Sequence, residues 1–167
     1  MSTNAVLEAA TGTAKRQFCT FWVAGRLYGV DITDVKEVNA ECEFTPVFLA
    51  PPEVKGYVNI RGHIHLIIDL CTLLGFKSID KTDSSRIVLF KPDVGDSFGV
   101  FVDRVGDVVA VAHDNIEIQS VIQTGKEELA ENPAIGIDLT AGVCKLDKEL
   151  MVILNAGKVL AAMQAHM

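Results

Sequence analysis

The chain has 167 residues, of which 49% are hydrophobic and 22% are charged. This length and composition exclude disorder of the whole chain and suit either one ordinary domain or two small barrels that share an interior. The formal net charge of -7 argues against nucleic acid or an acidic membrane surface as a general partner and favours a protein partner.

The expected elements begin after an N-terminal arm. Residues 1–15 are rich in Ala, Thr and Ser and show no sustained period, as in a loosely ordered segment. From Gln17 onward, short runs rich in Val, Ile and Phe alternate with Gly, Pro or Asp clusters about every ten residues, the pattern of an all-β barrel or sandwich. We expect strands at residues 17–23, 26–32, 35–44, 57–61, 63–70, 86–91, 97–103, 105–112, 134–139, 143–146 and 149–154. A helical turn is expected at 70–75 and a helix at 155–164.

An internal match at an offset of 70 residues suggests two related halves. It sets residues 28–38 (YGVDITDVKEV) over 98–108 (FGVFVDRVGDV), with four of eleven positions identical. Chance similarity among Val-rich strands is one explanation. We favour a duplication, which predicts barrels at about 16–80 and 86–154, hinged at the polar stretch 80–85, and a helix at 155–165. It also predicts that four side chains point into the barrel interiors at matching places: Val30, Ile32, Val100 and Val102.

Few side chains are placed to carry chemistry. His63 and His65 share a strand face with Asp69, and the apolar residues between them are expected to face the core. Asp69 would lie roughly 20 Å from His63, too far to share an ion, so we expect a solvated or interface-facing surface and no metal. His113 and Asp114 lie in a turn-like polar segment, and the chain lacks the common nucleophile and phosphate-binding motifs. We therefore expect neither catalysis nor a cofactor.

Cysteine spacing and the terminal sequence bear on location. The four cysteines, at positions 19, 42, 71 and 144, form no Cys-x-x-Cys pair, and we interpret them as reduced fillers of the core. The first eight residues hold no basic stretch followed by an apolar run, and no segment reaches the roughly 18 apolar residues of a membrane span. The sequence therefore predicts a soluble, unexported protein.

The segment 51–62 (PPEVKGYVNIRG) is the most distinctive part of the chain. Asn59, Arg61 and Gly62 place a polar corner between two apolar strands. An arginine held in a tight turn can present its planar guanidinium to a partner, and arginine is enriched among interface anchors. The alternative is that Arg61 braces its own turn by bonding to carbonyl groups.

This corner, together with several other segments, closely resembles the CheW family of chemotaxis coupling proteins. The resemblance runs from about Phe18 to Leu160, and its most specific features are the Asn-Ile-Arg-Gly corner at 59–62 and the Gly-Val-Phe-Val-Asp strand at 99–103. Further matches are YGVDI at 28–32, VKEV at 35–38, Pro46, VKG at 54–56, IIDL at 67–70 and RV at 104–105.

The resemblance implies both a fold and a role. The fold is all-β, with two SH3-like five-stranded barrels packed together and a short C-terminal helix. The role is that of a cytoplasmic adaptor in receptor arrays, without catalytic activity, that bridges the regulatory domain of the CheA histidine kinase to the tips of methyl-accepting chemoreceptors. Carrying over the family's binding surfaces assigns partner contact to Val35, Glu37, Gly56, Asn59, Arg61, Gly62, Ile87 and Gly99.

One departure and several alternatives stay open. Family members often carry proline where this chain has Leu66, and Leu66 restores a backbone donor to that strand. A related coupling protein of another array, such as one for twitching motility, or a ligand-sensing β-barrel protein would fit the same sequence. The two-domain adaptor CheV is disfavoured because the coupling fold uses the whole chain and leaves no receiver domain.

Overall fold

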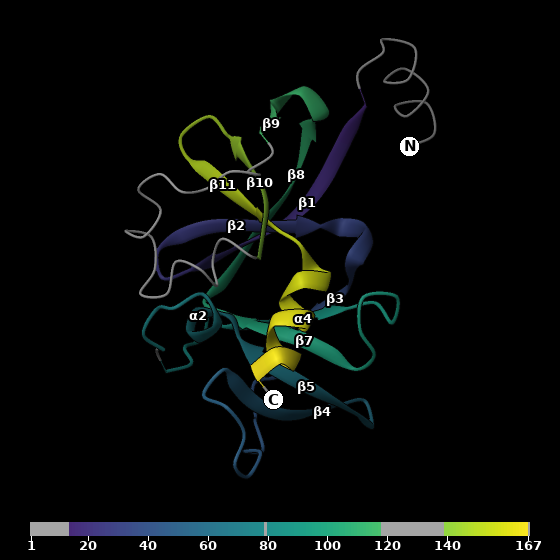
Figure 1. Ribbon diagram of the computed structural model, residues 1–167, viewed down its shortest axis with the longest axis vertical. Helices are drawn as coiled ribbons and strands as arrows, with labels where there is room; N and C mark the ends of the chain where they lie inside the picture. The colour runs from purple at the N-terminus through teal and green to yellow at the C-terminus, as the bar shows by residue number, and fades with distance from the viewer. Residues whose placement is uncertain (1–13, 79, 118–138, 167) are drawn as a thin grey trace.

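The computed structural model describes residues 14–78, 80–117 and 139–166, and its strands form two sheets that pack against each other (Figure 1). Most of the arm expected at 1–15, and all but the last residue of the strand expected at 134–139, lie outside the described residues. In the described part, no helix is long and apolar enough to cross a membrane.

The first sheet has six strands in the order β8-β1-β2-β11-β10-β9. The β1-β2 hairpin turns at Ala24 and Gly25, both with positive φ, which matches the twist of paired strands. Strand β2 pairs in parallel with β11, so the first and last hairpins of the chain lie side by side. The strands are β1 (Lys15–Val23), β2 (Arg26–Asp31), β8 (Arg104–Ala112), β9 (Ile116–Glu117), β10 (Thr140–Lys145) and β11 (Leu150–Leu154).

The second sheet has five strands in the order β3-β6-β7-β5-β4. They are β3 (Val35–Asn39), β4 (Val54–Ile60), β5 (His63–Asp69), β6 (Arg86–Phe90) and β7 (Phe98–Val102). Beyond β3 the chain returns to the edge strand β4, where the backbone N–H groups of Thr45 and Tyr57 each donate to the other's carbonyl oxygen at 2.8 Å. This bridge joins the segment that follows one edge strand to the other edge strand and so closes the sheet into a small barrel.

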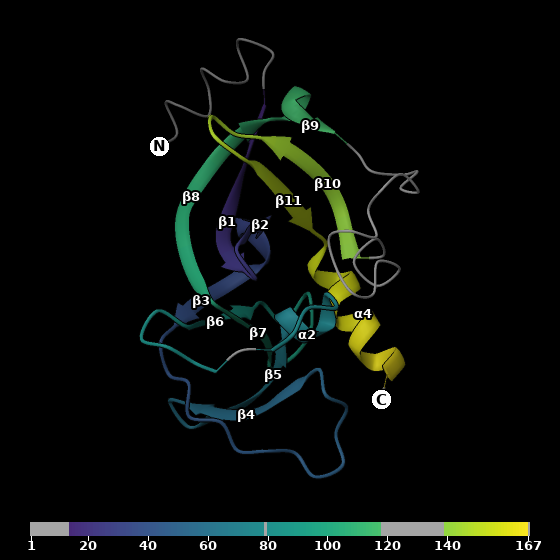
Figure 2. The ribbon, with the colours of Figure 1, turned by 90° about the vertical axis from the view of Figure 1, so that its left-hand side faces the viewer.

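The chain crosses between the sheets twice. Strand β2 leads through the 3-10 turn η1 (Ile32–Asp34) into β3 of the second sheet, and β7 leads through Asp103 into β8 of the first, as Figure 2 shows. The expected division into barrels at 16–80 and 86–154 is therefore wrong. Each sheet takes one hairpin from one half of the chain and its other strands from the other half, because β8 pairs with β1 and β3 pairs with β6.

The offset-70 match nevertheless marks equivalent places in the two sheets. Each of β2 and β7 is antiparallel to the strand before it and parallel to a strand from the other half. Val30, Val100 and Val102 are buried and Ile32 is partly buried, but all four belong to one cluster that both sheets share. The expected separate interiors are formed by two other clusters, one around Phe18 and Ile153 and one around Ile67 and Leu89.

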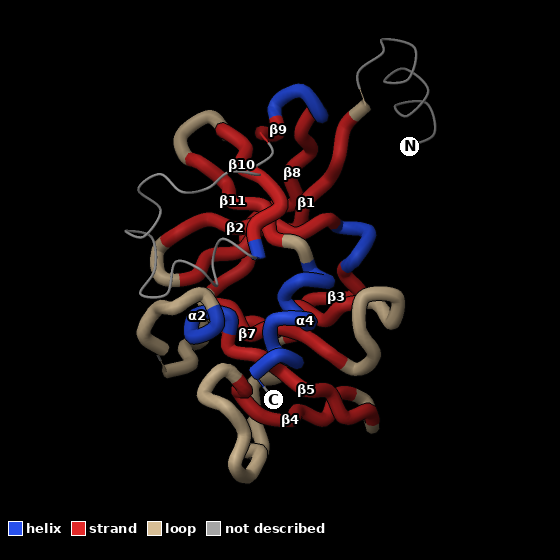
Figure 3. Tube along the Cα trace, viewed as in Figure 1, coloured by secondary structure: helices blue, strands red, loops and turns tan. Residues whose placement is uncertain are grey.

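Helices α2 (Leu70–Leu73) and α4 (Ala156–His166) complete the described part of the fold (Figure 3). Asp69 begins the short helix α2, since its carboxylate accepts from the backbone N–H of Cys71 at 3.1 Å. The C-terminal helix α4 confirms the predicted one, and its Val159 and Met163 pack into the shared cluster beside both sheets. The all-β class with two packed SH3-like barrels and a C-terminal helix is thus confirmed, with one sheet of six strands.

Candidate partner-binding surface

The Arg61 corner is a two-residue hairpin turn. Ile60 and His63 pair across the hairpin, and the residues between them, Arg61 (φ 53°) and Gly62 (φ 86°), both adopt the left-handed conformation. The Asn59 side-chain oxygen accepts from the backbone N–H of Gly62 at 2.9 Å. Asn59 therefore braces the turn, and the Arg61 side chain can interact with residues outside it.

Arg61 forms an ion pair with Glu37 across the mouth of the second barrel. The two residues come from the β4-β5 turn and from β3, which lies at the opposite end of the strand order. The hydrogen bond from Arg61 holds the pKa of the Glu37 carboxyl below its ordinary value. The Arg61 side chain is 66% exposed and that of Glu37 is 23% exposed, so the pair stabilises the fold by about 0 to 1 kcal/mol but presents a guanidinium and a carboxylate to solvent together.

Gly56, Ile87 and Gly99, three of the expected contact residues, lie in the interior. Ile87 is fully buried, and a Cβ at Gly99 would lie 2.7 Å from the carbonyl oxygen of Val88. A Cβ at Gly56 would lie 2.7 Å from the carbonyl oxygen of Thr45, in the bridge that closes the barrel. These three residues are therefore buried, contrary to the exposed position that direct contact requires, because β6 and β7 are inner strands and β4 is covered by the returning chain.

Glu37 and the two buried glycines, Gly56 and Gly99, lie in one row across the second sheet. The row runs through successive backbone partners from β3 to β4: Glu37, Leu89, Gly99, Ile67 and Gly56. The missing side chains leave room for Leu89, Ile67 and the Thr45 backbone on the concave side. We interpret the glycines as allowing the curvature that brings the two ends of the sheet, and so Glu37 and Arg61, together.

Strands β3 and β8, which follow the two crossings, carry a second surface, and this one is apolar. Of its residues, only Val35 is among the predicted contacts. Val35 and Val105 are the equivalent residues of β3 and β8 near the crossings, and both pack partly against the shared cluster. Further along, Val38 and Val108 are 41% and 53% exposed. Each pairs with a residue of the shared cluster, so both face the side on which the sheets meet. The offset-70 match maps Val35 and Val38 onto Val105 and Val108 and could have identified the latter two.

Asp31 holds the first crossing in place. Its carboxylate accepts from the backbone N–H of Thr33 at 2.9 Å and from the guanidinium of Arg16 at 2.9 Å. Partial burial raises the pKa of Asp31, but the hydrogen bonds from Thr33 and Arg16 outweigh burial and keep this pKa below its ordinary value. The charged carboxylate thus fixes the turn that delivers Val35 to β3.

His65 does not lie on a solvated face, contrary to the sequence analysis. It is 6% exposed and faces the interior of the second barrel on the same side as Ile67, whereas Ile64 on the other face is exposed. The reason is that β5 lies between β7 and β4 and is covered on both sides along most of its length. Among the described residues, no group of three or more His, Cys, Asp or Glu could hold a metal ion.

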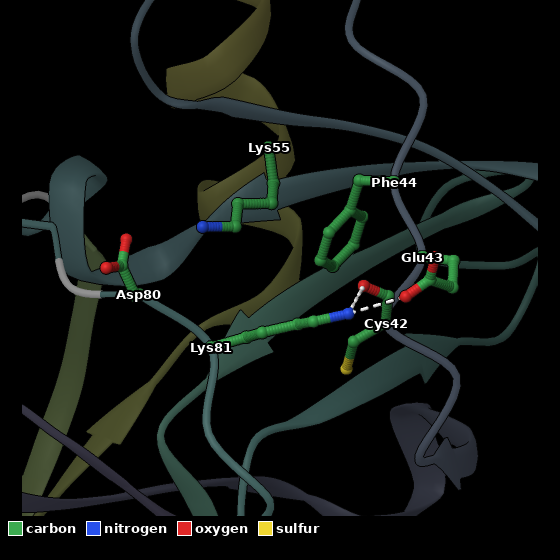
Figure 4. Close-up of a pocket in the computed structure, with 6 residues that line it drawn as sticks. All are labelled: Cys42, Glu43, Phe44, Lys55, Asp80 and Lys81. Atoms are coloured by element: carbon green, nitrogen blue, oxygen red, sulfur yellow. Dashed lines mark hydrogen bonds and ion pairs between the residues drawn. The ribbon is translucent and has the colours of Figure 1, made fainter.

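An open cavity of about 440 Å³ lies beside the second barrel (Figure 4). Its lining consists of Cys42, Glu43, Phe44, Lys55, Asp80 and Lys81. The Lys81 ammonium donates to the Cys42 carbonyl oxygen at 3.1 Å and to Glu43 at 2.6 Å, while Lys55 lies over the rings of Phe44 and Phe101. Burial raises the pKa of the Cys42 thiol, which disfavours its reactive thiolate form.

Known proteins resemble this chain along most of its length. The family described as CheW-like domain matches residues 17–164. The chemotaxis protein CheW of Treponema pallidum (strain Nichols) is 28% identical over 152 residues, which cover 87% of this chain and 82% of that protein. CheW of Bacillus subtilis (strain 168) is 28% identical over 154 residues, 92% of this chain and 90% of that protein. The crystal structure of the scaffolding protein TtCheW from Thermoanaerobacter tengcongensis matches with a TM-score of 0.72 and 28% identity, covering 85% of this chain and 90% of that one.

Proposed function

Because this chain belongs to the CheW family, we propose that it is a non-enzymatic adaptor that couples methyl-accepting chemoreceptors to a CheA-type histidine kinase by binding both at once. The observation that carries the proposal is the family match over residues 17–164, which includes both sheets and both crossings. The similarity to the scaffolding protein TtCheW supports the same class of function. The protein would act in the cytoplasm, at the tips of membrane receptors, through its partners.

The proposed contact surface combines a charged corner with an apolar strip. At the corner, Arg61 and Glu37 offer opposite charges to a partner, and Asn59 and Gly62 hold the turn that presents them. The strip consists of Val35, Val38, Val105 and Val108. In this proposal Gly56, Ile87 and Gly99 affect binding indirectly, through the curvature of the second barrel.

Two surfaces of different chemistry suit a protein that joins two partners. The apolar strip suits the apolar side chains of a helical receptor tip. The charged corner suits a partner that supplies complementary charges and thereby orients the complex. A molecule with two such surfaces can raise the local concentration of one partner near the other without any chemical step.

A titration tests the bridging role. Receptors and kinase from the same organism are reconstituted in membranes, and kinase activity is measured while this protein is added from substoichiometric amounts to large excess. Activity should rise and then fall, because excess adaptor occupies each partner separately. A substoichiometric amount that activates many kinase molecules and stays effective after its removal would refute the proposal.

The same experiment addresses the alternative of a different array. Receptors and kinases of each array of the organism are tested in turn, and the pairing whose kinase activity depends on this protein identifies the system that it serves. No feature of the described residues favours the ligand-sensing alternative, since the open cavity pairs its lysines with a carboxylate or aromatic rings.

A further inference from the structure

His65 is a buried titratable group that has no role in the proposed function. It lies in the interior of the second barrel, opposite Val58 of β4, and its Nδ1 atom has no hydrogen-bond partner among the described residues. A buried ring nitrogen without a hydrogen-bond partner is costly, so Nδ1 adds no bond that would hold the ring in place.

The charged groups that act on His65 include both members of the Arg61–Glu37 pair in the proposed contact surface. They are Lys36 and Glu37 from β3, Arg61 from the β4-β5 turn and His63 from β5 itself. Of the strands that flank β5, β7 is wholly apolar and the one charged residue of β4, Lys55, lies over aromatic rings. Glu37 and His65 both face the barrel interior, because Glu37 pairs with Leu89 and His65 shares its face with Ile67. Glu37 is thus the one carboxylate in this set, and it is engaged by Arg61.

We propose that His65 makes the Arg61 corner sensitive to acid: when the ring takes up a proton, the imidazolium engages Glu37, and Arg61 is released. The inference rests on the proposed function in so far as the corner binds a partner. Burial, followed by the nearby Lys36 and His63, lowers the pKa of His65. The Arg61 hydrogen bond lowers the pKa of Glu37, so that its carboxylate stays charged while the histidine titrates.

Titration of the free protein by NMR tests the exchange without any partner. The ring signals of His65 should titrate below pH of about 6.5, the ordinary value for histidine, and the guanidinium signals of Arg61 should shift with the same midpoint. In His65→Leu, which removes the titrating group but keeps an apolar side chain, the Arg61 shift should disappear. If this variant folds poorly, His65→Asn serves instead. An Arg61 signal that ignores the His65 titration would overturn the proposal.

Binding to receptor tips then tests the consequence. Between pH 7.5 and pH 5.5 the wild-type affinity should fall, by up to about tenfold per pH unit for one linked proton, while the affinity of His65→Leu stays constant. The exposed neighbour supplies the control: His63→Gln keeps His65 and should therefore retain a pH-dependent affinity, with a raised midpoint because His63 no longer lowers the pKa of His65. An unchanged pH dependence in His65→Leu would refute the switch. Absence of any binding at pH 7.5 would instead count against the proposed function and leave the NMR result to decide on the switch.

Discussion

Arg61 occupies a strained backbone position in the turn between β4 and β5. A left-handed conformation costs a non-glycine residue about 1 to 2 kcal/mol, yet Arg61 adopts it with φ 53°. The neighbouring Gly62 meets the same requirement without a Cβ. From this first turn position the Arg61 side chain reaches Glu37, so the strained residue is the one that forms the ion pair.

Replacing Arg61 by Asn separates binding from stability. Asparagine tolerates the left-handed turn, so Arg61→Asn should change the free energy of unfolding by less than about 1 kcal/mol, since the lost pair is exposed. Its binding to receptor or kinase should weaken by about 1 to 4 kcal/mol. Urea denaturation and titration calorimetry measure the two quantities. An equal loss of stability and binding would point to a bracing role for Arg61.

His65 also predicts how stability depends on pH. Its pKa is lowered in the folded state relative to about 6.5 in the unfolded chain, so between these two values the unfolded state binds more protons. The stability contributed by the neutral ring is therefore complete above pH of about 6.5 and declines as the pH falls toward the folded-state pKa. Urea midpoints of the wild type should fall more between pH 7.5 and pH 5.5 than those of His65→Leu. Equal changes in the two proteins would contradict this prediction.

At the scale of elements, the row from Glu37 to Gly56 runs from the proposed contact surface through the interior of the second sheet. Gly99→Ala places a methyl group against the Val88 carbonyl oxygen and the Leu89 side chain, at 2.7 Å and 2.8 Å. We expect a loss of about 1 to 3 kcal/mol in the free energy of unfolding, together with weaker partner binding, because the sheet can no longer curl as far.

A glycine in the first turn of α4 supplies the matched control. The nearest atom to a Cβ at Gly157 is the Asn155 side-chain oxygen at 3.3 Å, and alanine is preferred over glycine in a helix by up to about 1 kcal/mol. Gly157→Ala should therefore keep both stability and binding. Thermal unfolding compares the stability of the two variants with that of the wild type. A Gly99→Ala protein as stable as the wild type would rule out the tight packing at this row.

At the scale of the whole molecule, the two halves of the chain depend on each other. Each sheet combines a hairpin from one half with strands from the other. In an isolated half, the strands of each sheet would therefore lack the partners that the other half supplies. Fragments 1–79 and 80–167, separated in the exposed stretch between α2 and β6, should each lack a cooperative thermal transition. Mixed together, they should regain the near-native circular dichroism spectrum and one transition. A cooperative transition in one isolated fragment would contradict the exchange of strands.

Much of the fold and of the candidate site could be predicted from local patterns in the sequence. Strands follow from short Val- and Ile-rich runs between turn residues, the corner follows from Asn59, Arg61 and Gly62, and the family resemblance follows from motifs near both. These features are local, because alternation and turn conformation depend on neighbours in the chain. The offset-70 match likewise marked equivalent strands in the two sheets, β2 and β7.

Strand partners and burial could not be predicted in the same way. Apolar strands such as β1, β6 and β8 can pair with several others by local pattern alone, and the choice of β8 for β1 depends on the packing of the whole shared core. In the second sheet, the same kind of choice pairs β6 with β3 and β7, and β5 with β7 and β4. These pairings place Ile87 and Gly99 inside and cover His65. Alternation shows which residues share a face of a strand, but whether a face meets water or another layer depends on contacts between residues far apart in the chain.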